Sequence, residues 1–186
     1  GSEMCKETDS LYQNGLFRTY DYPPLFNSAN LSIRSFVNKG QEKVIGSRDG
    51  LFYINEATGV VKSFVKPVLT SDLILTICFY QGEYYIGTYG GGMMVLNPET
   101  LSLKYFAQGD TELFQKGHIF CVKPDAKGNL WIGTSQGLFS YNGQTKQIKS
   151  FTSANSQLPE GNVYEVSFDS TGKGSVSYTH LRAHET

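Results

Sequence analysis

The chain is a succession of short apolar runs separated by segments of turn-forming residues. In its last third these runs are Ile119 to Val122, Leu130 to Thr134, Gly137 to Tyr141 and Gln147 to Phe151. The first break, "KPDAKGN", combines proline, aspartate and glycine, and the last, "NGQTK", starts with an Asn-Gly pair that favours tight hairpins. Short runs joined by such breaks predict four antiparallel strands.

This pattern recurs along the chain. The stretch "WIGTSQGLFSYN" (131–142) is matched by "VIGSRDGLFYIN" (44–55) and "YIGTYGGGMMVLN" (85–97). Its glycines, Gly46, Gly87 and Gly133, are 41 and 46 residues apart. A second marker, a basic residue followed two positions later by an aromatic residue, keeps the same step at Arg18, Lys62, Lys104 and Lys149. Two markers in step indicate a structural repeat of about 40–45 residues.

Four strands in each repeat of this length are typical of a β-propeller blade. The middle runs "YYIG" and "LWIG" are apolar at successive positions, as expected for strands covered on both faces by neighbouring blades. The sequence therefore predicts an all-β fold, a β-propeller fragment of four-stranded antiparallel blades, over residues 1–175. We expect whole blades at 31–64, 74–106 and 119–151, and partial blades at about 8–20 and 163–175.

The last residues break this pattern. The run "VSYTHLRAHET", Val176 to Thr186, matches an in-frame translation of a transposase sequencing adapter. We interpret 176–186 as a non-native tail and exclude it from the domain; the alternative is a native terminal strand. His180 and His184 lie in this tail, which leaves His118 as the candidate histidine.

Charge and composition exclude several classes of function. The net charge is −1 and no basic run is present, so a nucleic-acid partner is not expected. No apolar run approaches the roughly 20 residues of a membrane span, and no targeting signal is recognisable. No Cys/His spacing indicates zinc, and no cofactor is predicted. Cys78 and Cys121 occupy matching first-strand positions and are expected to be buried thiols.

The repeats resemble the two-component regulator propeller family, the sensor region of hybrid two-component histidine kinases of gut Bacteroidetes. The stretch "HIFCVKPDAKGNLWIGTSQGLFSYN" and the connection "NSQLPEGNVYEVSFDSTGKG" carry this resemblance. The first two repeats depart from the family pattern, because Val44 and Tyr85 replace its tryptophan and Gly92-Met93 replaces Gly-Leu.

The resemblance implies a periplasmic receptor with two propellers, an immunoglobulin-like segment, a membrane helix and a cytoplasmic kinase that signals by phosphorelay. It also implies that the full-length receptor is a homodimer and that its usual ligand is an oligosaccharide. The transmitting domains lie outside these 186 residues, so no catalytic residue is carried over to this chain.

The candidate ligand site lies on the disc face that carries the connections between blades, the longest being Ala107 to His118. Carbohydrate recognition uses aromatic surfaces together with carboxylate, amide and guanidinium groups. The residues of these types on that face are Arg48, Asp49, Tyr89, Asp110, Glu112, Phe114, His118 and Gln136. The alternative for Phe114 and His118 is loop packing, and the alternative for the Gly90-Gly91-Gly92 run is a tight turn without a ligand.

We therefore expect a ligand-sensing domain without catalysis of its own. A propeller lyase or hydrolase acting on polysaccharide would need paired carboxylates or a histidine base, and the sequence offers no convincing set. A protein-interaction scaffold could use the same face. These two alternatives remain open at the level of the sequence.

Overall fold

The computed structural model describes residues 8–13, 16–21, 32–107 and 111–178, which fall into two compact units. In the first unit (Gly1–Leu31), β1 (Thr8–Gln13) pairs with β2 (Leu16–Asp21) as an antiparallel hairpin. This hairpin coincides with the partial blade predicted at 8–20. Everything below concerns the second unit (Ser32–Thr186).

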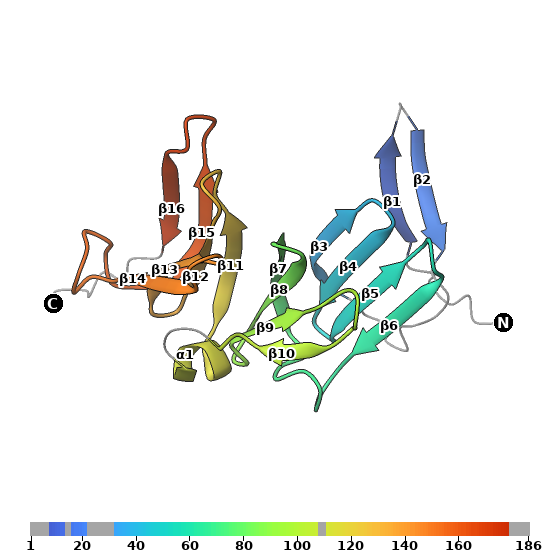
Figure 1. The fold of residues 1–186 in the computed structure, drawn as a ribbon, viewed down its shortest axis with the longest axis horizontal. Helices are drawn as coiled ribbons and strands as arrows, with labels where there is room; N and C mark the ends of the chain where they lie inside the picture. Colours follow the sequence, from blue (N-terminus) through green and yellow to red (C-terminus); the bar gives the residue numbers. More distant parts are fainter. Residues whose placement is uncertain (1–7, 14–15, 22–31, 108–110, 179–186) are drawn as a thin grey trace, which may run out of the picture. The chain divides into compact units, whose positions relative to one another are not determined.

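The second unit contains three four-stranded antiparallel sheets, each with its strands in sequence order (Figure 1). We call them blades 1, 2 and 3, and they confirm the predicted all-β propeller fold. Blade 1 contains β3 (Ile33–Lys39), β4 (Glu42–Ser47), β5 (Leu51–Asn55) and β6 (Val60–Phe64). Blade 2 contains β7 (Ile74–Tyr80), β8 (Glu83–Thr88), β9 (Met93–Leu96) and β10 (Leu103–Tyr105). Blade 3 contains β11 (Ile119–Pro124), β12 (Asn129–Thr134), β13 (Gly137–Asn142) and β14 (Gln147–Phe151).

A further hairpin follows blade 3. It joins β15 (Val163–Phe168) to β16 (Gly174–Tyr178), and β15 matches the strand predicted for the start of another blade. The domain boundary expected at residue 175 lies inside β16, three residues before its end. Pairing in β16 does not bear on the origin of the tail, because any short extended segment can add backbone hydrogen bonds to a neighbouring strand. Residues 179–186 lie outside the described part of the chain.

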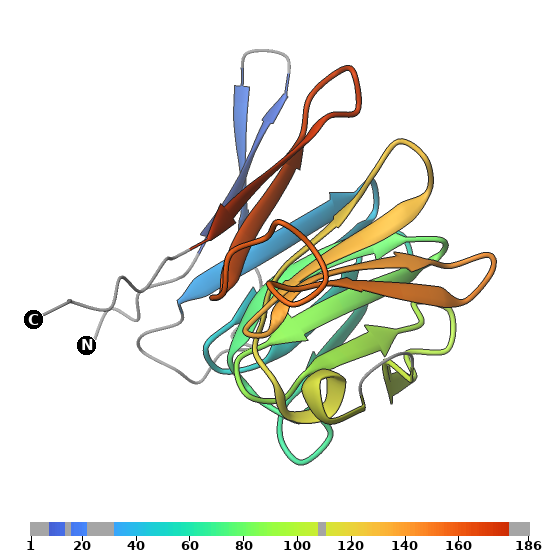
Figure 2. The ribbon, with the colours of Figure 1, turned by 90° about the vertical axis from the view of Figure 1, so that its left-hand side faces the viewer.

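The middle strands of the blades are covered on both faces. Every residue of β8 from Tyr84 to Thr88 is buried, and so is all of β9, whereas the outer strand β6 is exposed at four of its five positions. Figure 2 shows the successive sheets seen from another side. Stacking of one sheet on the next explains the continuous apolar runs, since no face of a middle strand is left for water.

The repeated glycine leaves room for the first residue of the next blade to pack against it. A Cβ added to Gly87 would lie 2.7 Å from Ile119 Cγ2, and one added to Gly133 would lie 2.7 Å from the carbonyl oxygen of Val163. Gly46 faces Ile74 in the same way. Ile74, Ile119 and Val163 are the first residues of β7, β11 and β15, and each is fully buried. The glycine of the repeat is therefore required for stacking of the blades.

The asparagine at the end of each quoted stretch closes the turn between the third and fourth strands. Asn142 Oδ1 accepts hydrogen bonds from the backbone N–H groups of Gln144 and Thr145, at 3.0 Å each. Asn55 and Asn97 make the equivalent pairs in blades 1 and 2. The hairpin predicted from Asn-Gly is present, but its turn is held by the asparagine side chain.

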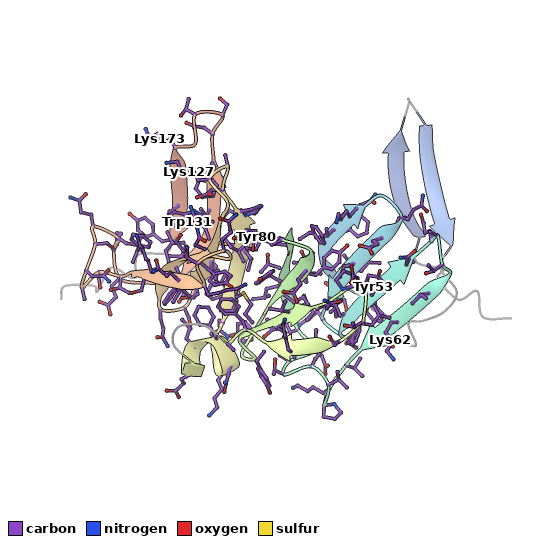
Figure 3. All side chains as sticks on the ribbon, viewed as in Figure 1. Tyr53, Lys62, Tyr80, Lys127, Trp131 and Lys173 are labelled. Carbon is purple, nitrogen blue, oxygen red and sulfur yellow. The ribbon has the colours of Figure 1, made fainter. Side chains whose placement is uncertain are left out.

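Tyrosine hydroxyls join the blades at the end where first and second strands meet. Tyr80 Oη donates to the carbonyl oxygen of Gly128 (2.6 Å) and accepts from the N–H of Gly143 (2.9 Å), linking blade 2 to blade 3. Glu42 accepts hydrogen bonds from Tyr53 and Tyr84, linking blade 1 to blade 2. Tyr53 and Tyr80 are labelled in Figure 3. Burial, with the carboxylate of Glu42 nearby, raises the pKa of the Tyr84 hydroxyl, so it stays a donor.

One helix lies in the connection predicted as an irregular loop. Thr111–Lys116 form α1, in which Leu113 and Phe114 are buried, and the N–H of Gly117 donates to the carbonyl oxygen of Leu113. A helix this short offers less than two turns of periodicity, so its pattern does not stand out in the sequence. Among the described residues, no helix has both the length and the apolar character needed to cross a membrane.

Cys78 and Cys121 are buried free thiols, as expected. Burial raises the pKa of each thiol to about 11. Such thiols are almost fully protonated near neutral pH and serve as small apolar side chains between blades.

Candidate functional site

The turns between second and third strands share one construction. Ser47 and Thr134 donate from their hydroxyl groups to the carbonyl oxygens of Gly50 and Gly137, and Thr88 donates to that of Gly92. These contacts explain the Ser or Thr that follows the repeated glycine. They fix the turns that present Arg48 and Asp49, Tyr89, and Gln136.

Each of these turns is also tied to the segment that enters the first strand of its own blade. The N–H of Arg48 donates to Ser32 (3.2 Å), that of Tyr89 to Leu73 (3.0 Å), and that of Ser135 to His118 (3.2 Å). The turns and the connections between blades therefore lie at the same end of the blades, which is the arrangement predicted from strand alternation. We call this the α1 end; in both ribbon views it is opposite the β15–β16 turn (Figures 1 and 2).

Tyr89 and His118 form the centre of the candidate site. Their rings are stacked, with centroids 4.0 Å apart and planes inclined by 29°. Tyr89 lies in the β8–β9 turn of blade 2 and is 51% exposed, whereas His118 directly precedes β11 of blade 3. His118 Nδ1 is buried and makes no hydrogen bond within the described residues. The structure thus brings together two of the residues selected from the sequence, from neighbouring blades.

The row of rings continues through two residues that the sequence analysis missed. The rings of His118 and Phe120 are 6.1 Å apart, and those of Phe120 and Tyr164 are 4.6 Å apart. Tyr164 is 40% exposed, and its hydroxyl accepts a hydrogen bond from Asn162 Nδ2 at 2.9 Å. We call Tyr89, His118, Phe120 and Tyr164 the aromatic row. Phe120 and Tyr164 lie inside strands, where sequence reasoning did not look for ligand contacts.

Phe114 is a correction to the predicted site. Its side chain is fully buried, and its ring packs edge-to-face against Phe106 (5.0 Å) and Phe139 (5.4 Å) in the core between blades 2 and 3. Helix α1 turns this residue inward. Phe114 therefore stabilises the fold and cannot contact a ligand on the surface, as the packing alternative held.

The remaining predicted residues are distributed along the α1 end. Arg48, Asp49 and Gln136 are exposed in the turns of blades 1 and 3. Glu112 is exposed in the first turn of α1. Asp110 lies outside the described residues.

The triple glycine of blade 2 accommodates the chain's own backbone. Gly92 has φ +68°, and a Cβ there would collide with the backbone of Phe114 and Gln115 in α1. Thr70 Oγ1 donates to the carbonyl oxygen of Gly91 (2.6 Å), and the N–H of Gly92 donates to Gly117 (2.9 Å). The geometry therefore favours the tight turn, which is hydrogen-bonded to neighbouring segments of the chain. It does not favour a site where a ligand approaches the backbone.

A cavity of about 570 Å³ lies at the opposite end and is lined by Trp131 together with Phe168 and Val176 of the β15–β16 hairpin. Trp131 is labelled in Figure 3. Trp131 Nε1 donates to Asp125 Oδ2 at 2.9 Å. At the corresponding position in blade 2, Tyr85 is covered by Tyr141 of a complete neighbouring blade. We attribute the cavity to coverage of blade 3 by two strands instead of four, and we do not assign it a ligand.

Comparison with known proteins agrees with the class of protein defined above, a β-propeller built from tandem four-stranded blades. Two similar solved structures are extracellular domains of putative hybrid two component systems from B. thetaiotaomicron. One has 19% identity and a TM-score of 0.67, over 86% of this chain and 21% of that one. The other has 25% identity and a TM-score of 0.61, over 87% and 22%. The chain therefore spans about a fifth of the length of these structures.

The fold is also shared with proteins of other kinds. The WD40 propeller domain of Doa1 matches with 14% identity and a TM-score of 0.64, over 92% of this chain and 54% of that one. No curated protein sequence matches the chain.

Residues 114–136 match the family model described as "Two component regulator propeller". This match confirms the resemblance inferred from the sequence for these residues, which are similar to the repeat of that family. The matched segment runs from α1 through β11 and β12 to the turn that holds Gln136.

Proposed function

We propose that this propeller segment is the ligand-sensing, extracytoplasmic part of a hybrid histidine kinase and that it recognises an oligosaccharide in the periplasm. The observation that carries the proposal is the exposed Tyr89 ring stacked on His118 and continued by Phe120 and Tyr164. The family repeat and the similar extracellular receptor domains support the sensor role.

The chemistry of the aromatic row suits a sugar. Aromatic rings offer apolar faces on which the C–H faces of a pyranose can pack, and the hydroxyls at the edges of the sugar need polar partners. The hydroxyl of Tyr164 and the amide of Asn162 supply donors and acceptors at one end of the row. Catalysis is not part of this proposal, since these groups suit binding and orientation.

Tyr89→Ala is expected to weaken oligosaccharide binding about tenfold, equivalent to ~1.4 kcal/mol, because the exposed stacking face is lost. The measurement is calorimetric titration of the receptor ectodomain with a panel of plant and host oligosaccharides. Tyr105→Ala is the matched control: Tyr105 is 50% exposed, close to the 51% of Tyr89, but lies on the outer strand β10. Equal losses in the two variants would contradict the assignment of the row.

The same panel separates the alternative functions. Hydrolysis or elimination of any oligosaccharide would favour a propeller enzyme. Absence of binding to every sugar, together with capture of a defined protein partner, would favour an interaction scaffold.

We further propose that residues 1–175 belong to a longer propeller and that 176–186 are foreign to it. The partners expected from this proposal are the missing blades, downstream signalling domains of the same chain and a second copy in a homodimeric receptor. Sequencing the source gene on both sides of the segment is expected to yield further repeats, then a membrane helix and a kinase. A catalytic domain in their place, or a native gene that continues through "THLRAHET", would overturn the respective part of the proposal.

A further inference from the structure

The first strand of each of blades 1, 2 and 3, and strand β15, contain a register shift at the same place. The shifts lie between Ile33 and Ser35 in β3, Ile74 and Thr76 in β7, Ile119 and Cys121 in β11, and Val163 and Glu165 in β15. Each leaves one residue without a partner in the ladder. These four residues are Arg34, Leu75, Phe120 and Tyr164, and we call them the bulge line.

A bulge changes the direction in which the side chain of its extra residue points, and here that side chain lies outside the core. Ile74, Ile119 and Val163, which precede the extra residues, are fully buried. Leu75 and Phe120 are partly exposed, and Arg34 and Tyr164 are exposed. Ile74, Ile119 and Val163 each pack against the glycine of the preceding blade, so stacking of the blades fixes where Leu75, Phe120 and Tyr164 emerge. Ile33, which precedes Arg34, is 50% exposed.

Members of the bulge line come from neighbouring strands. The N–H of Ile77 in β7 donates to Ser35 Oγ in β3 at 2.9 Å, next to Arg34. Strand β11 contacts β7 on one side and β15 on the other, and the rings of Phe120 and Tyr164 are 4.6 Å apart. The line therefore has a cationic end in blade 1 and an aromatic end at β11 and β15.

The cationic end offers two guanidinium groups. Arg34 and Arg48 are both exposed in blade 1, and the backbone of Arg48 is bonded to Ser32, two residues before Arg34. The ion pairs found among the described residues involve only Lys43, Lys104 and Lys123 as cations. Guanidinium groups match the planar geometry of carboxylates and also bind sulfate and phosphate oxygens in a bidentate manner.

We propose that the bulge line is a binding subsite for an anionic oligosaccharide, with the acid group on Arg34 and a neutral sugar face on Phe120 and Tyr164. This inference rests on the proposed sugar-sensing function and narrows its ligand class. The shared chemistry is a negatively charged sugar, which can carry a uronate carboxylate or a sulfate ester.

The test is calorimetric titration of the receptor ectodomain with three probes: a galacturonic acid trisaccharide, its carboxyl-reduced neutral counterpart and a sulfated galactose oligosaccharide. Arg34→Gln is expected to weaken binding of the preferred anionic probe about tenfold and to reduce its salt dependence, leaving the neutral probe unchanged. Lys62→Gln removes one exposed charge from the outer strand β6 and is the control, with no change expected.

The outcomes separate the two proposals. Preference for the uronate or for the sulfate, lost in Arg34→Gln, supports the subsite and identifies the acid group. Binding of neutral and acidic probes with equal affinity in both the parent and Arg34→Gln overturns the subsite but leaves the sugar-sensing function standing. Failure of a broad panel of neutral and acidic sugars to bind overturns both.

Discussion

Gly87→Ala is expected to lower the free energy of unfolding by about 3 kcal/mol, near the upper end of overpacking costs. The added Cβ would lie 2.6 Å from Thr76 Cγ2 and 2.7 Å from Ile119 Cγ2. Ile119 is fully buried between blades and has a stiff β-branched side chain, so it cannot move aside without shifting β11. Urea denaturation followed by circular dichroism measures the loss.

Gly82→Ala in the same β7–β8 hairpin is the control. Gly82 has φ +86° and no atom within 4 Å of an added Cβ, so alanine there adds backbone strain without a clash. That strain should cost about 1 kcal/mol. If the two variants lose equal stability, the repeated glycine serves its own backbone conformation and not the stacking of blades.

Phe114→Ala is expected to cost about 3–5 kcal/mol, the range for truncation of a buried phenylalanine. The ring is fully buried between Phe106 and Phe139, so its removal leaves a cavity where α1 docks on blades 2 and 3. Thermal denaturation gives the loss of stability. Phe114→Leu should retain more of the packing and, once folded, the oligosaccharide affinity of the parent.

Gln115→Ala is the neighbouring control, because Gln115 is exposed on the same helix and should change stability by less than about 0.5 kcal/mol. Loss of affinity in a fully folded Phe114→Leu variant would restore Phe114 to the binding site and contradict its assignment to the core.

The substitution of Gly87 bears on the aromatic row as well as on stability. Gly87 holds Ile119, and the next residue, Phe120, emerges at the bulge beside His118. Displacement of Ile119 would therefore also misplace the aromatic row. The repeat motif thus determines where the residues of the aromatic row lie.

Much of the fold followed from the sequence because its determinants are local. Blade 3 has the four strands expected from its apolar runs, each boundary agreeing within two residues. Helix α1 was missed because six residues carry too little periodicity. The turn after Asn142 was predicted as a hairpin, but the role of the asparagine side chain became visible only in its hydrogen bonds.

The candidate site was predicted less completely, and the errors have a common cause. Tyr89, His118 and Phe114 were all selected because they lie in loops, with loop packing as the alternative for His118 and Phe114. The structure stacks Tyr89 on His118 and buries Phe114 in the core. Phe120 and Tyr164 were overlooked because a β-bulge cannot be recognised from a single sequence. The bulges form where the buried residues Ile119 and Val163 pack against glycines of the preceding blade.

The sequence by itself determined the repeat and the strand count of each blade, since turn residues and apolar runs act over a few neighbouring positions. Only the tertiary structure decided which aromatic rings meet and which side chains reach the surface. Those properties depend on residues about one blade apart in the chain, and they exist only once one sheet has packed against the next.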